Sequence, residues 1–493
     1  MKEKNHSKKA AYSFLFIAIC SFIMSLCASN NPFHIGDSHA DSSIFTYVGK
    51  LILHGGMPYR DTFDHKGPLM YLINALGLAV NEQIGIWIIE LITITIIFGF
   101  SYKIARILGC SQFASCAVVA VNVLTLSYYF QAGNLVEEYA CAFITVSCYI
   151  FVEFFIKDTV RPIELIICGA SFAAVCLLRI NMAALWPVMC IWVIIERIRK
   201  GKSKDIIHFI LWFVLGMAIV AVPILLWLSV NGAFPAFVED YFKFNFMYSS
   251  DPVRASKINV IKAIYYFASG SPMLISLPIL IYFCISKRDL LNWLIMFTAA
   301  LSLLFMCVSG QSSGYEHYGM ILCPLVVFSV SELLSELSLK GGLRSKNTKA
   351  AVVFSLTAAC VLVFTSSEFV LARAALRVIH PATIFPDERE AASVIRENTN
   401  EDDLIFVTGN KDIIYLLSDR YSASIYSYQY PIANIDPGIK SAYLSDLEQK
   451  QPKMIVFADE EFFDPGIDEI LDNGYKKIST IGKYNLYLFT DSK

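Results

Sequence analysis

A polar, acidic stretch between Asp37 and Pro68 contains the residues best suited to chemistry. Its four aspartates are Asp37, Asp41, Asp61 and Asp64. His65 and Lys66 follow directly after the last of them. A partly desolvated carboxylate can take a proton from a hydroxyl or amine as a general base, and a lysine ammonium can neutralise a phosphate. The stretch therefore predicts a site that activates a hydroxyl and neutralises a phosphate at a membrane surface.

Asp41 and Asp37 are the two candidates for the base, because both lie just beyond the first apolar run. Asp41 also fits a structural role. Aspartate is a preferred N-cap, and the segment IFTYVGKLILHG that follows is predicted to be a helix. Both interpretations of Asp41 stay open on the sequence alone.

The segment YRDTFDHKGP brings together Asp64, His65 and Lys66, and a new helix is predicted to start at Pro68. Lys66 is suited to a phosphate oxygen, with Asp64 and His65 shaping the site. The alternative is a salt-bridged turn that caps the next helix. The predicted position at the bilayer interface favours the functional interpretation.

Charged residues inside or at the ends of apolar runs form a second group of candidates. Glu137 and Glu138 begin one run, and Arg179 ends another. Burying a charge in a membrane is costly unless it is paired or faces a cavity. Either glutamate could therefore pair with Arg179, or Arg179 could hold an anionic lipid head. Glu90 lies within a run, where a functional role and a hydrogen bond inside the bundle are both open.

His317, in the segment GYEHYGM, is a candidate contact for a phosphate or sugar, or an ordinary interfacial histidine. Lys243, Arg254 and Lys257 are predicted to lie outside, where they suggest either an anionic ligand or anionic lipid. Paired acids can hold Mg²⁺ or Mn²⁺, but the spacing does not require a metal. No cofactor is therefore assigned.

The composition places the chain among membrane proteins. Of its 493 residues, 56% are hydrophobic and only 17% are charged, against roughly 25% charged in soluble domains. The net charge of -2 gives no information about a nucleic-acid partner, but the lack of a basic block that resembles a nucleic-acid arm argues against one. The 13 cysteines lie in apolar segments and form neither a disulfide framework nor a CxxC metal pair.

About eleven apolar runs approach the roughly 20 residues needed to cross a bilayer. We predict spans at 11–29, 83–107, 112–130, 135–156, 162–178, 183–197, 206–230, 260–285, 289–308, 319–337 and 350–370. The first is interpreted as an uncleaved span rather than a signal peptide. The segment 68–80 is too short to span, so an interfacial or re-entrant helix is expected there.

Basic loops alternate along the chain, which predicts a cytoplasmic N-terminus and an external C-terminus. The predicted domains are a transmembrane domain at 1–370, with its catalytic first external loop at 30–82, and an external domain at 371–493. From about Pro386, helical segments alternate with short apolar strands such as DLIFVTG and PKMIVFAD. This alternation indicates a small α/β domain, and it contains no nucleotide-binding motif.

At these residues the chain resembles the GT-C membrane glycosyltransferases. It looks closest to the bacterial branch related to protein O-mannosyltransferases and aminoarabinose transferases (glycosyltransferase family 39-like). The resemblance covers the layout of the whole chain, and its first two segments are the specific ones. The segments are ADSSIFTYVGK, GGMPYRDTFDHKGPLMYLINALG, GNLVEEYA and EHYGM.

The resemblance implies an enzyme of the bacterial cytoplasmic membrane with an external active site. It would transfer a sugar from a polyprenyl-phosphate donor, usually with inversion, to a lipid, glycan or protein acceptor of the cell envelope. Asp41, or alternatively Asp37, would be the base, and Glu138, with Glu137, would line the acceptor side. The implied donor-phosphate contacts are Asp64, His65, Lys66, Arg179 and His317.

Two other functions compete with this one. A transporter or flippase of lipid-linked sugars would place polar residues in broken mid-membrane helices and would show repeats. Here the polar residues gather at one face and no repeat is evident, which favours the enzyme. A structural scaffold for envelope assembly is the third possibility, and the concentration of acids in the first loop argues against it.

Overall fold

The computed structural model of the chain describes residues 2–33, 35, 40–250, 256–269, 272–308, 315–339, 370–380, 384–458 and 464–490. The chain divides into two compact units. The first consists of Met1–Asp37, Ile86–Ile224 and Pro252–His380. The second consists of Ser38–Gly85, Leu225–Asp251 and Pro381–Lys493. The second unit thus joins the first loop to the C-terminal residues, which are far away in sequence.

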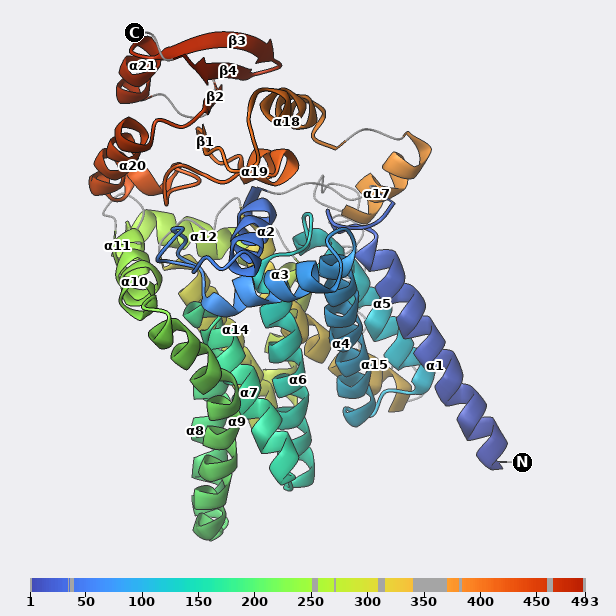
Figure 1. Cartoon of the computed structure of the whole chain (residues 1–493). Helices are drawn as coiled ribbons and strands as arrows, with labels where there is room; N and C mark the ends of the chain where they lie inside the picture. The colour runs from blue at the N-terminus through green and yellow to red at the C-terminus, as the bar shows by residue number, and fades with distance from the viewer. Residues whose placement is uncertain are drawn as a thin grey trace. The chain divides into compact units, whose positions relative to one another are not determined.

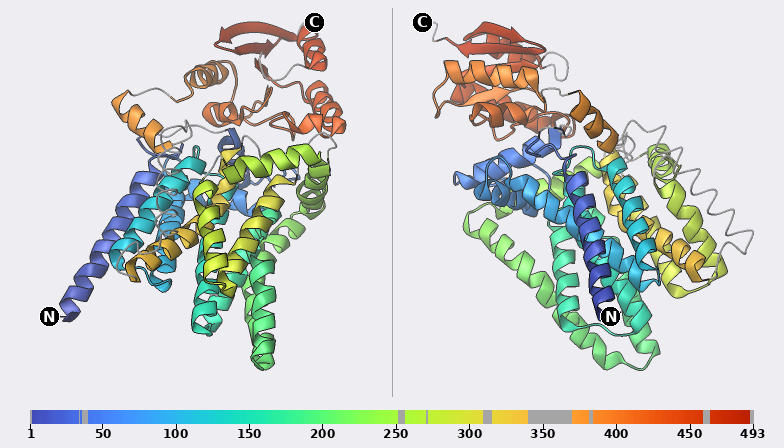
Figure 2. Two further views of the ribbon diagram at one scale, coloured as in Figure 1. Left: turned by 180° about the vertical axis from the view of Figure 1, so that it is seen from behind. Right: turned by 90° about the vertical axis from the view of Figure 1, so that its right-hand side faces the viewer.

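The first unit is helical, and its helices α4, α5 and α6 run alongside one another (Figures 1 and 2). Helix α5 packs against α1 and α15, and α6 packs against α7. The α-helices of this unit are α1 (Lys2–Ser25), α4 (Gly85–Ile107), α5 (Gln112–Tyr129), α6 (Val136–Lys157), α7 (Pro162–Cys176), α8 (Leu185–Arg199), α9 (Ser203–Val230), α12 (Lys257–Ser269), α13 (Met273–Ser286), α14 (Leu290–Cys307), α15 (Cys323–Leu339) and α17 (Val370–Ile379). Two short 3₁₀ helices, η1 (Ile180–Met182) and η3 (Glu316–Leu322), complete it.

Six helical segments of the described residues are long and apolar enough to cross a membrane: α4, α5, α6, α9, α14 and η3 with α15. The number becomes seven if the bent pair α12 and α13 counts as one span. Eleven were predicted. The predicted span at 11–29 corresponds to α1, whose apolar part Ala10–Ser25 is among the shorter apolar helices. The predicted spans at 162–178 and 183–197 correspond to α7 and α8, of 15 residues each. The predicted span at 350–370 lies almost entirely outside the described residues.

In the second unit, the first loop forms two helices joined by a turn. Helix α2 (Ala40–Leu53) packs against α3 (Pro68–Val80) so closely that a Cβ on Gly49 would lie 2.8 Å from the backbone nitrogen of Ala75. Across the same contact, Thr46 Oγ1 donates to Asn74 Oδ1 at 3.2 Å. Helix α3 begins at Pro68, where the sequence predicted it, because proline suits the first helical position. The two helices fix the turn that carries Asp61, Asp64, His65 and Lys66.

Residues 225–251 add a short helical run to this unit, formed by α10 (Phe234–Phe237), the π-helix η2 (Val238–Phe244) and α11 (Asn245–Ser250). Its aromatic side chains pack on the turn of the first loop. The ring of Phe244 lies 5.1 Å from that of Phe63, and the ring of Phe237 lies 5.3 Å from that of Tyr59.

The C-terminal part of the second unit is a four-stranded sheet with helices, as the alternating pattern predicted. The strands follow the order β1-β2-β4-β3, with β1 parallel to β2 and the other pairs antiparallel. They are β1 (Ile405–Val407), β2 (Met454–Ala458), β3 (Tyr475–Ile481) and β4 (Tyr484–Phe489). The helices are α18 (Pro386–Asn398), α19 (Asp412–Ser418), the 3₁₀ turn η4 (Ile432–Asn434), α20 (Pro437–Lys450) and α21 (Pro465–Asp472). Strands β1 and β2 are fully buried, which explains their continuous apolar sequences.

Candidate functional site

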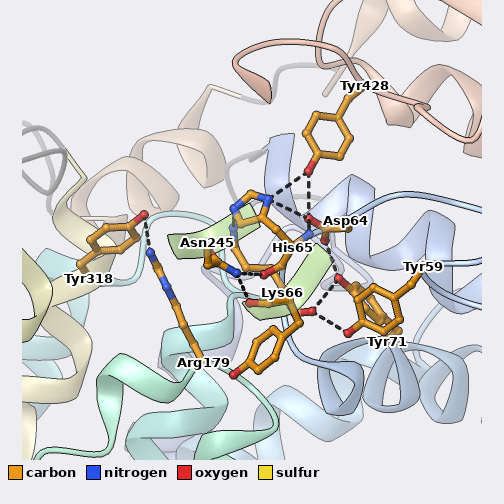
Figure 3. Close-up of polar contacts among 10 residues, drawn as sticks. Tyr59, Asp64, His65, Lys66, Tyr71, Arg179, Asn245, Tyr318 and Tyr428 are labelled. Atoms are coloured by element: carbon orange, nitrogen blue, oxygen red, sulfur yellow. Dashed lines mark hydrogen bonds and ion pairs between the residues drawn. The ribbon is translucent and has the colours of Figure 1, made fainter. Parts of the chain in front are cut away.

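Asp64 is a buried carboxylate held by hydroxyl groups from two distant parts of the second unit. Tyr71 donates to its Oδ2 at 2.8 Å, and Tyr428 donates to its Oδ1 at 2.9 Å. The backbone N–H of His65 also donates to Oδ1, at 2.7 Å. Burial raises the pKa of Asp64, while the charge of Lys66 and the tyrosine hydrogen bonds oppose that rise. The carboxylate is therefore fixed in place by its neighbours, as Figure 3 shows.

His65 and Lys66 continue this chain of contacts. His65 Nδ1 lies 3.4 Å from Asp64 Oδ1, and His65 Nε2 lies 2.8 Å from Lys66 Nζ. Because a lysine ammonium can only donate, Nε2 is the acceptor, and Nδ1 carries the proton that faces Asp64. The His65 ring stacks on Tyr248, with a centroid distance of 5.6 Å. We name Asp64, His65 and Lys66 the acid–histidine–lysine chain.

Contacts to the backbone of His65 and Lys66 hold the acid–histidine–lysine chain in position. The carbonyl of Lys66 accepts from Tyr59 at 2.7 Å. The Tyr71 hydroxyl shares its one proton between Asp64 and this carbonyl, which lies 3.1 Å away. The carbonyl of His65 accepts from Asn245 Nδ2 at 2.7 Å (Figure 3). Three separate segments therefore immobilise two consecutive residues.

The Lys66 ammonium does not form the salt-bridged turn that was the alternative to a phosphate site. Asp61 pairs instead with Arg60, at 2.7 Å, and accepts from the backbone of Met57. Among the residues that the structure describes, Lys66 forms no ion pair within 4.0 Å. The half-buried ammonium of Lys66 thus donates one hydrogen bond, to neutral His65. Its other N–H groups can donate to a ligand.

Asp41 lies in the first turn of α2, which begins at Ala40, so it follows the helix start rather than preceding it as an N-cap. It is half-buried. Its negative charge raises the pKa of both Asp412 and Tyr428, which places it within electrostatic reach of the C-terminal residues of this unit. Asp37, the alternative base, lies outside the described residues.

Two more carboxyl groups of the second unit belong to the same electrostatic neighbourhood. Asp412 is fully buried and accepts from Ser427 at 2.6 Å. Burial raises its pKa to about 7, and the charges of Asp64 and Asp41 add to the effect. Burial likewise raises the pKa of Asp240 to about 8, with a contribution from Asp64. The acids of this unit therefore repel one another, and a bound cation or proton would relieve that repulsion.

The first unit holds the other predicted residues in a separate network. Arg179 pairs with Glu137 at 3.1 Å, rather than with Glu138. It also donates to the hydroxyl of Tyr318 at 3.2 Å and lies 4.4 Å from the centre of that ring (Figure 3). His317 Nδ1 lies 2.8 Å from Gln131 Oε1. Both predicted donor contacts in this unit thus already have protein partners.

Glu90 and Glu138 meet at one backbone amide. The N–H of Asn134 lies 2.6 Å from Glu90 Oε1 and 2.9 Å from Glu138 Oε2, and all three residues are buried. Gln131, Gly133 and Asn134 all have positive φ, so this turn is tightly constrained. A Cβ on Gly133 would lie 2.3 Å from Glu90 Oε1. Glu90 thus closes the turn, which is the hydrogen-bonding alternative foreseen for it.

Among the described residues, the cations predicted to face outward show no shared anion site. Lys243 pairs with Glu239 at 2.8 Å, Lys257 is exposed at the start of α12, and Arg254 lies outside the described residues. In the part of the chain that the structure describes, no group of three or more His, Cys, Asp or Glu side chains could hold a metal ion.

The sequence analysis missed the contribution of the C-terminal residues Asp412, Ser427 and Tyr428. Tyr428 lies 364 residues from Asp64, so no local pattern linked them. The run YSYQY was a detectable signal, since three tyrosines in a polar segment of a small α/β domain are unusual.

The comparisons with known proteins begin with the family. Residues 2–380 match the family described as "Putative competence-induced protein Ccs4 N-terminal domain". The chain belongs to the Ccs4 family. Residues 386–490 match the C-terminal domain of the same family. No curated protein matches the sequence.

Solved structures show the fold. The chain is similar to ArnT from Cupriavidus metallidurans bound to undecaprenyl phosphate, with 14% identity, a TM-score of 0.64 and 98% of each chain covered. It is also similar to the archaeal oligosaccharyltransferase AglB from Archaeoglobus fulgidus, in complex with an inhibitory peptide and a dolichol-phosphate. That match has 12% identity and a TM-score of 0.53, and covers 98% of this chain and 75% of AglB. The Ccs4-family chain is therefore a polytopic membrane protein with the GT-C fold of these two proteins.

Proposed function

We propose that the protein is an integral-membrane glycosyltransferase that takes a sugar from a polyprenyl-phosphate donor. The acceptor is a lipid, glycan or protein of the cell envelope, reached at the external face of the bacterial cytoplasmic membrane. The observation that carries this proposal is the acid–histidine–lysine chain in a GT-C fold. A half-buried ammonium beside a neutral histidine is suited to a phosphate monoanion or dianion. The solved structures similar to this chain support a lipid-phosphate ligand, because ArnT was crystallised with undecaprenyl phosphate.

The roles of the residues follow from their chemistry. Asp41, with Asp37 as the alternative, is the base, and Lys66 is the main cation for the donor phosphate. Asp64 and His65 orient Lys66. Arg179 and His317 are further donor contacts, and Glu137 and Glu138 serve the acceptor side.

The reaction proceeds by inverting displacement at the anomeric carbon. Asp41 takes the proton of the acceptor hydroxyl as the oxygen attacks that carbon. The new glycosidic bond forms while the bond from the anomeric carbon to the phosphate oxygen breaks. The electron pair of the broken bond stays on the polyprenyl phosphate, and Lys66 stabilises that charge as it develops. The lipid tail of the donor stays in the bilayer throughout.

A flippase of lipid-linked sugars is not favoured. The proposed base Asp41 and the proposed phosphate cation Lys66 lie in the first turn of α2 and in the first loop. Transporters instead bind their substrates at discontinuous helices near the bilayer midplane. A structural scaffold would not need an ammonium held without an ion pair.

The proposal is tested with the full-length protein in lipid nanodiscs, given undecaprenyl-phosphate sugars and a membrane extract as the source of acceptors. We expect release of undecaprenyl phosphate that depends on both the protein and the extract. Proteoliposomes provide the competing test. Movement of the intact donor across the bilayer, with no release of undecaprenyl phosphate, would establish the flippase instead.

A further inference from the structure

Tyr428 connects the C-terminal domain to the first loop. It belongs to the segment that matches the family's C-terminal domain, and its hydroxyl donates to Asp64 Oδ1 at 2.9 Å. Tyr428 is 2% exposed and Asp64 is 3% exposed, so the bond is shielded from water. The second carboxylate oxygen of Asp64 accepts from Tyr71, so one tyrosine holds each oxygen (Figure 3).

The segment that carries Tyr428 is itself fixed at both ends. The backbone N–H of Phe63 donates to the carbonyl of Ile425 at 2.7 Å, which ties the segment to the first loop. On the other side, Gln429 is tied to Gly409 by two hydrogen bonds, of 2.9 Å and 3.0 Å. Gly409 lies just after β1, so the C-terminal sheet sets the position of the Tyr428 hydroxyl.

The orientation of Asp64 determines which ring nitrogen of His65 carries the proton. Asp64 Oδ1 and the Tyr428 hydroxyl both lie 3.4 Å from His65 Nδ1. A carboxylate facing Nδ1 favours the tautomer with its proton there, which leaves Nε2 free to accept from Lys66. Without the Tyr428 hydroxyl, Asp64 keeps only Tyr71 and a backbone amide, and it can turn away from Nδ1. The direction of the Lys66 ammonium then becomes less defined.

We propose that Tyr428 is a positioning residue for the donor phosphate site. Through it the C-terminal domain fixes Asp64 and His65, and so the direction of Lys66. This inference rests on the proposed function, in which Lys66 binds the phosphate of the donor. It goes further by giving the C-terminal domain a role in donor binding. The competing interpretation is that the Tyr428 bond only stabilises the fold.

A double-mutant cycle separates these interpretations. Binding of undecaprenyl phosphate is measured on the full-length protein in nanodiscs for Tyr428→Phe, Lys66→Ala and the double variant. We expect Tyr428→Phe to weaken binding about three- to tenfold, in the range for one ordinary intramolecular hydrogen bond. In the Lys66→Ala background, Tyr428→Phe should have no further effect, because its effect passes through Lys66.

Tyr426→Phe is the matched control. Tyr426 lies two residues away and packs on Phe63, with ring centres 5.3 Å apart, and no hydrogen bond of its hydroxyl is found among the described residues. We expect Tyr426→Phe to bind undecaprenyl phosphate normally. A second double-mutant cycle pairs Tyr71→Phe with Lys66→Ala and tests the hydrogen bond to the other oxygen of Asp64. Here too, the effects of the two substitutions on binding should not add.

The outcomes distinguish the two proposals. If Lys66→Ala binds normally, the phosphate role in the proposed function fails and this inference fails with it. If Lys66→Ala binds weakly while Tyr428→Phe binds normally, or if their effects add, this inference alone is overturned. Melting curves complete the test. A Tyr428→Phe variant with a lowered melting temperature and normal binding would show a purely structural bond.

Discussion

The two units use their candidate phosphate-binding cations in opposite ways. In the first unit, Arg179 is paired with Glu137 and lies over the ring of Tyr318, so the protein itself compensates its charge. In the second unit, Lys66 contacts a neutral histidine and forms no ion pair among the described residues. Breaking a buried ion pair is costly, because the remaining charge stays buried without a partner. We therefore expect Lys66 to be the main cation for the donor phosphate, and Arg179 to contribute less.

The acids of the two units differ in the same way. Glu90 and Glu138 share the amide of Asn134 and close a strained turn. Burial, together with the charges of Asp64 and Asp41, raises the pKa of Asp412 to about 7. We propose that the reactive groups are those of the second unit, because Asp64 and Asp412 share that unit with Lys66. The predictions below test this contrast.

The largest effect is expected for Asp41→Asn. The change keeps the size of the side chain and removes the basic oxygen, so transfer should fall by about 10²- to 10⁴-fold. Release of undecaprenyl phosphate measures the loss, and a melting curve checks the fold. Asp37→Asn should be milder. If Asp37→Asn abolished transfer and Asp41→Asn did not, the base would be Asp37.

Asp412→Asn should change stability with pH. Its carboxyl pKa is raised from 3.8 to about 7, so the folded protein holds a proton that the unfolded chain releases above about pH 4. Wild-type stability therefore falls as pH rises from about 4 to about 7, by at most roughly 4 kcal/mol. Asparagine removes this penalty, so Asp412→Asn should melt higher than wild type at pH 8 and similarly at pH 4.5.

The matched control for this pH dependence is Glu469→Gln, which removes one negative charge from an exposed position of α21. Its melting temperature should follow that of the wild type at both pH values. If Asp412→Asn also followed the wild type at pH 8, Asp412 would be ionised in the folded protein without penalty, and the contrast between the acids of the two units would weaken.

Arg179→Ala should destabilise the protein by about 3 kcal/mol, because it leaves Glu137 buried without its partner. Thermal melting measures this loss. The double variant Arg179→Ala with Glu137→Gln should recover part of it, since the unpaired charge is gone. If Arg179→Ala melted normally but bound undecaprenyl phosphate poorly, Arg179 would bind the phosphate as Lys66 is proposed to do. That result would contradict the difference between the two cations.

The sequence predicted some of this architecture because the signals were local. Gly67 and Pro68 marked the start of α3, and the apolar runs DLIFVTG and PKMIVFAD marked β1 and β2. The number of spans was harder to predict. Helices α7 and α8 are only 15 residues long each, and length alone does not decide whether such helices cross a bilayer.

The assembly of the site could be predicted only in part. Asp64, His65 and Lys66 are adjacent in sequence, so their proximity was certain. The bond from Tyr428 to Asp64 and the ion pair of Lys50 with Asp419 join segments more than 300 residues apart. Such contacts depend on how the C-terminal sheet packs, which no periodicity in a single sequence reveals.

Among the substitutions that compare the two units, the smallest effect is expected for Lys66→Ala, and it tests the contrast most directly. Loss of a charge-assisted hydrogen bond should weaken binding of undecaprenyl phosphate by roughly 1.5–3 kcal/mol, with little change in acceptor affinity or melting temperature. Lys50→Ala is the matched control, because Lys50 lies in the same unit and its charge is used by Asp419. It should bind normally and lose at most about 1 kcal/mol of stability. If the two lysine variants behaved alike, an ammonium without an ion pair would confer no binding role, and the distinction between Lys66 and Arg179 would have no functional meaning.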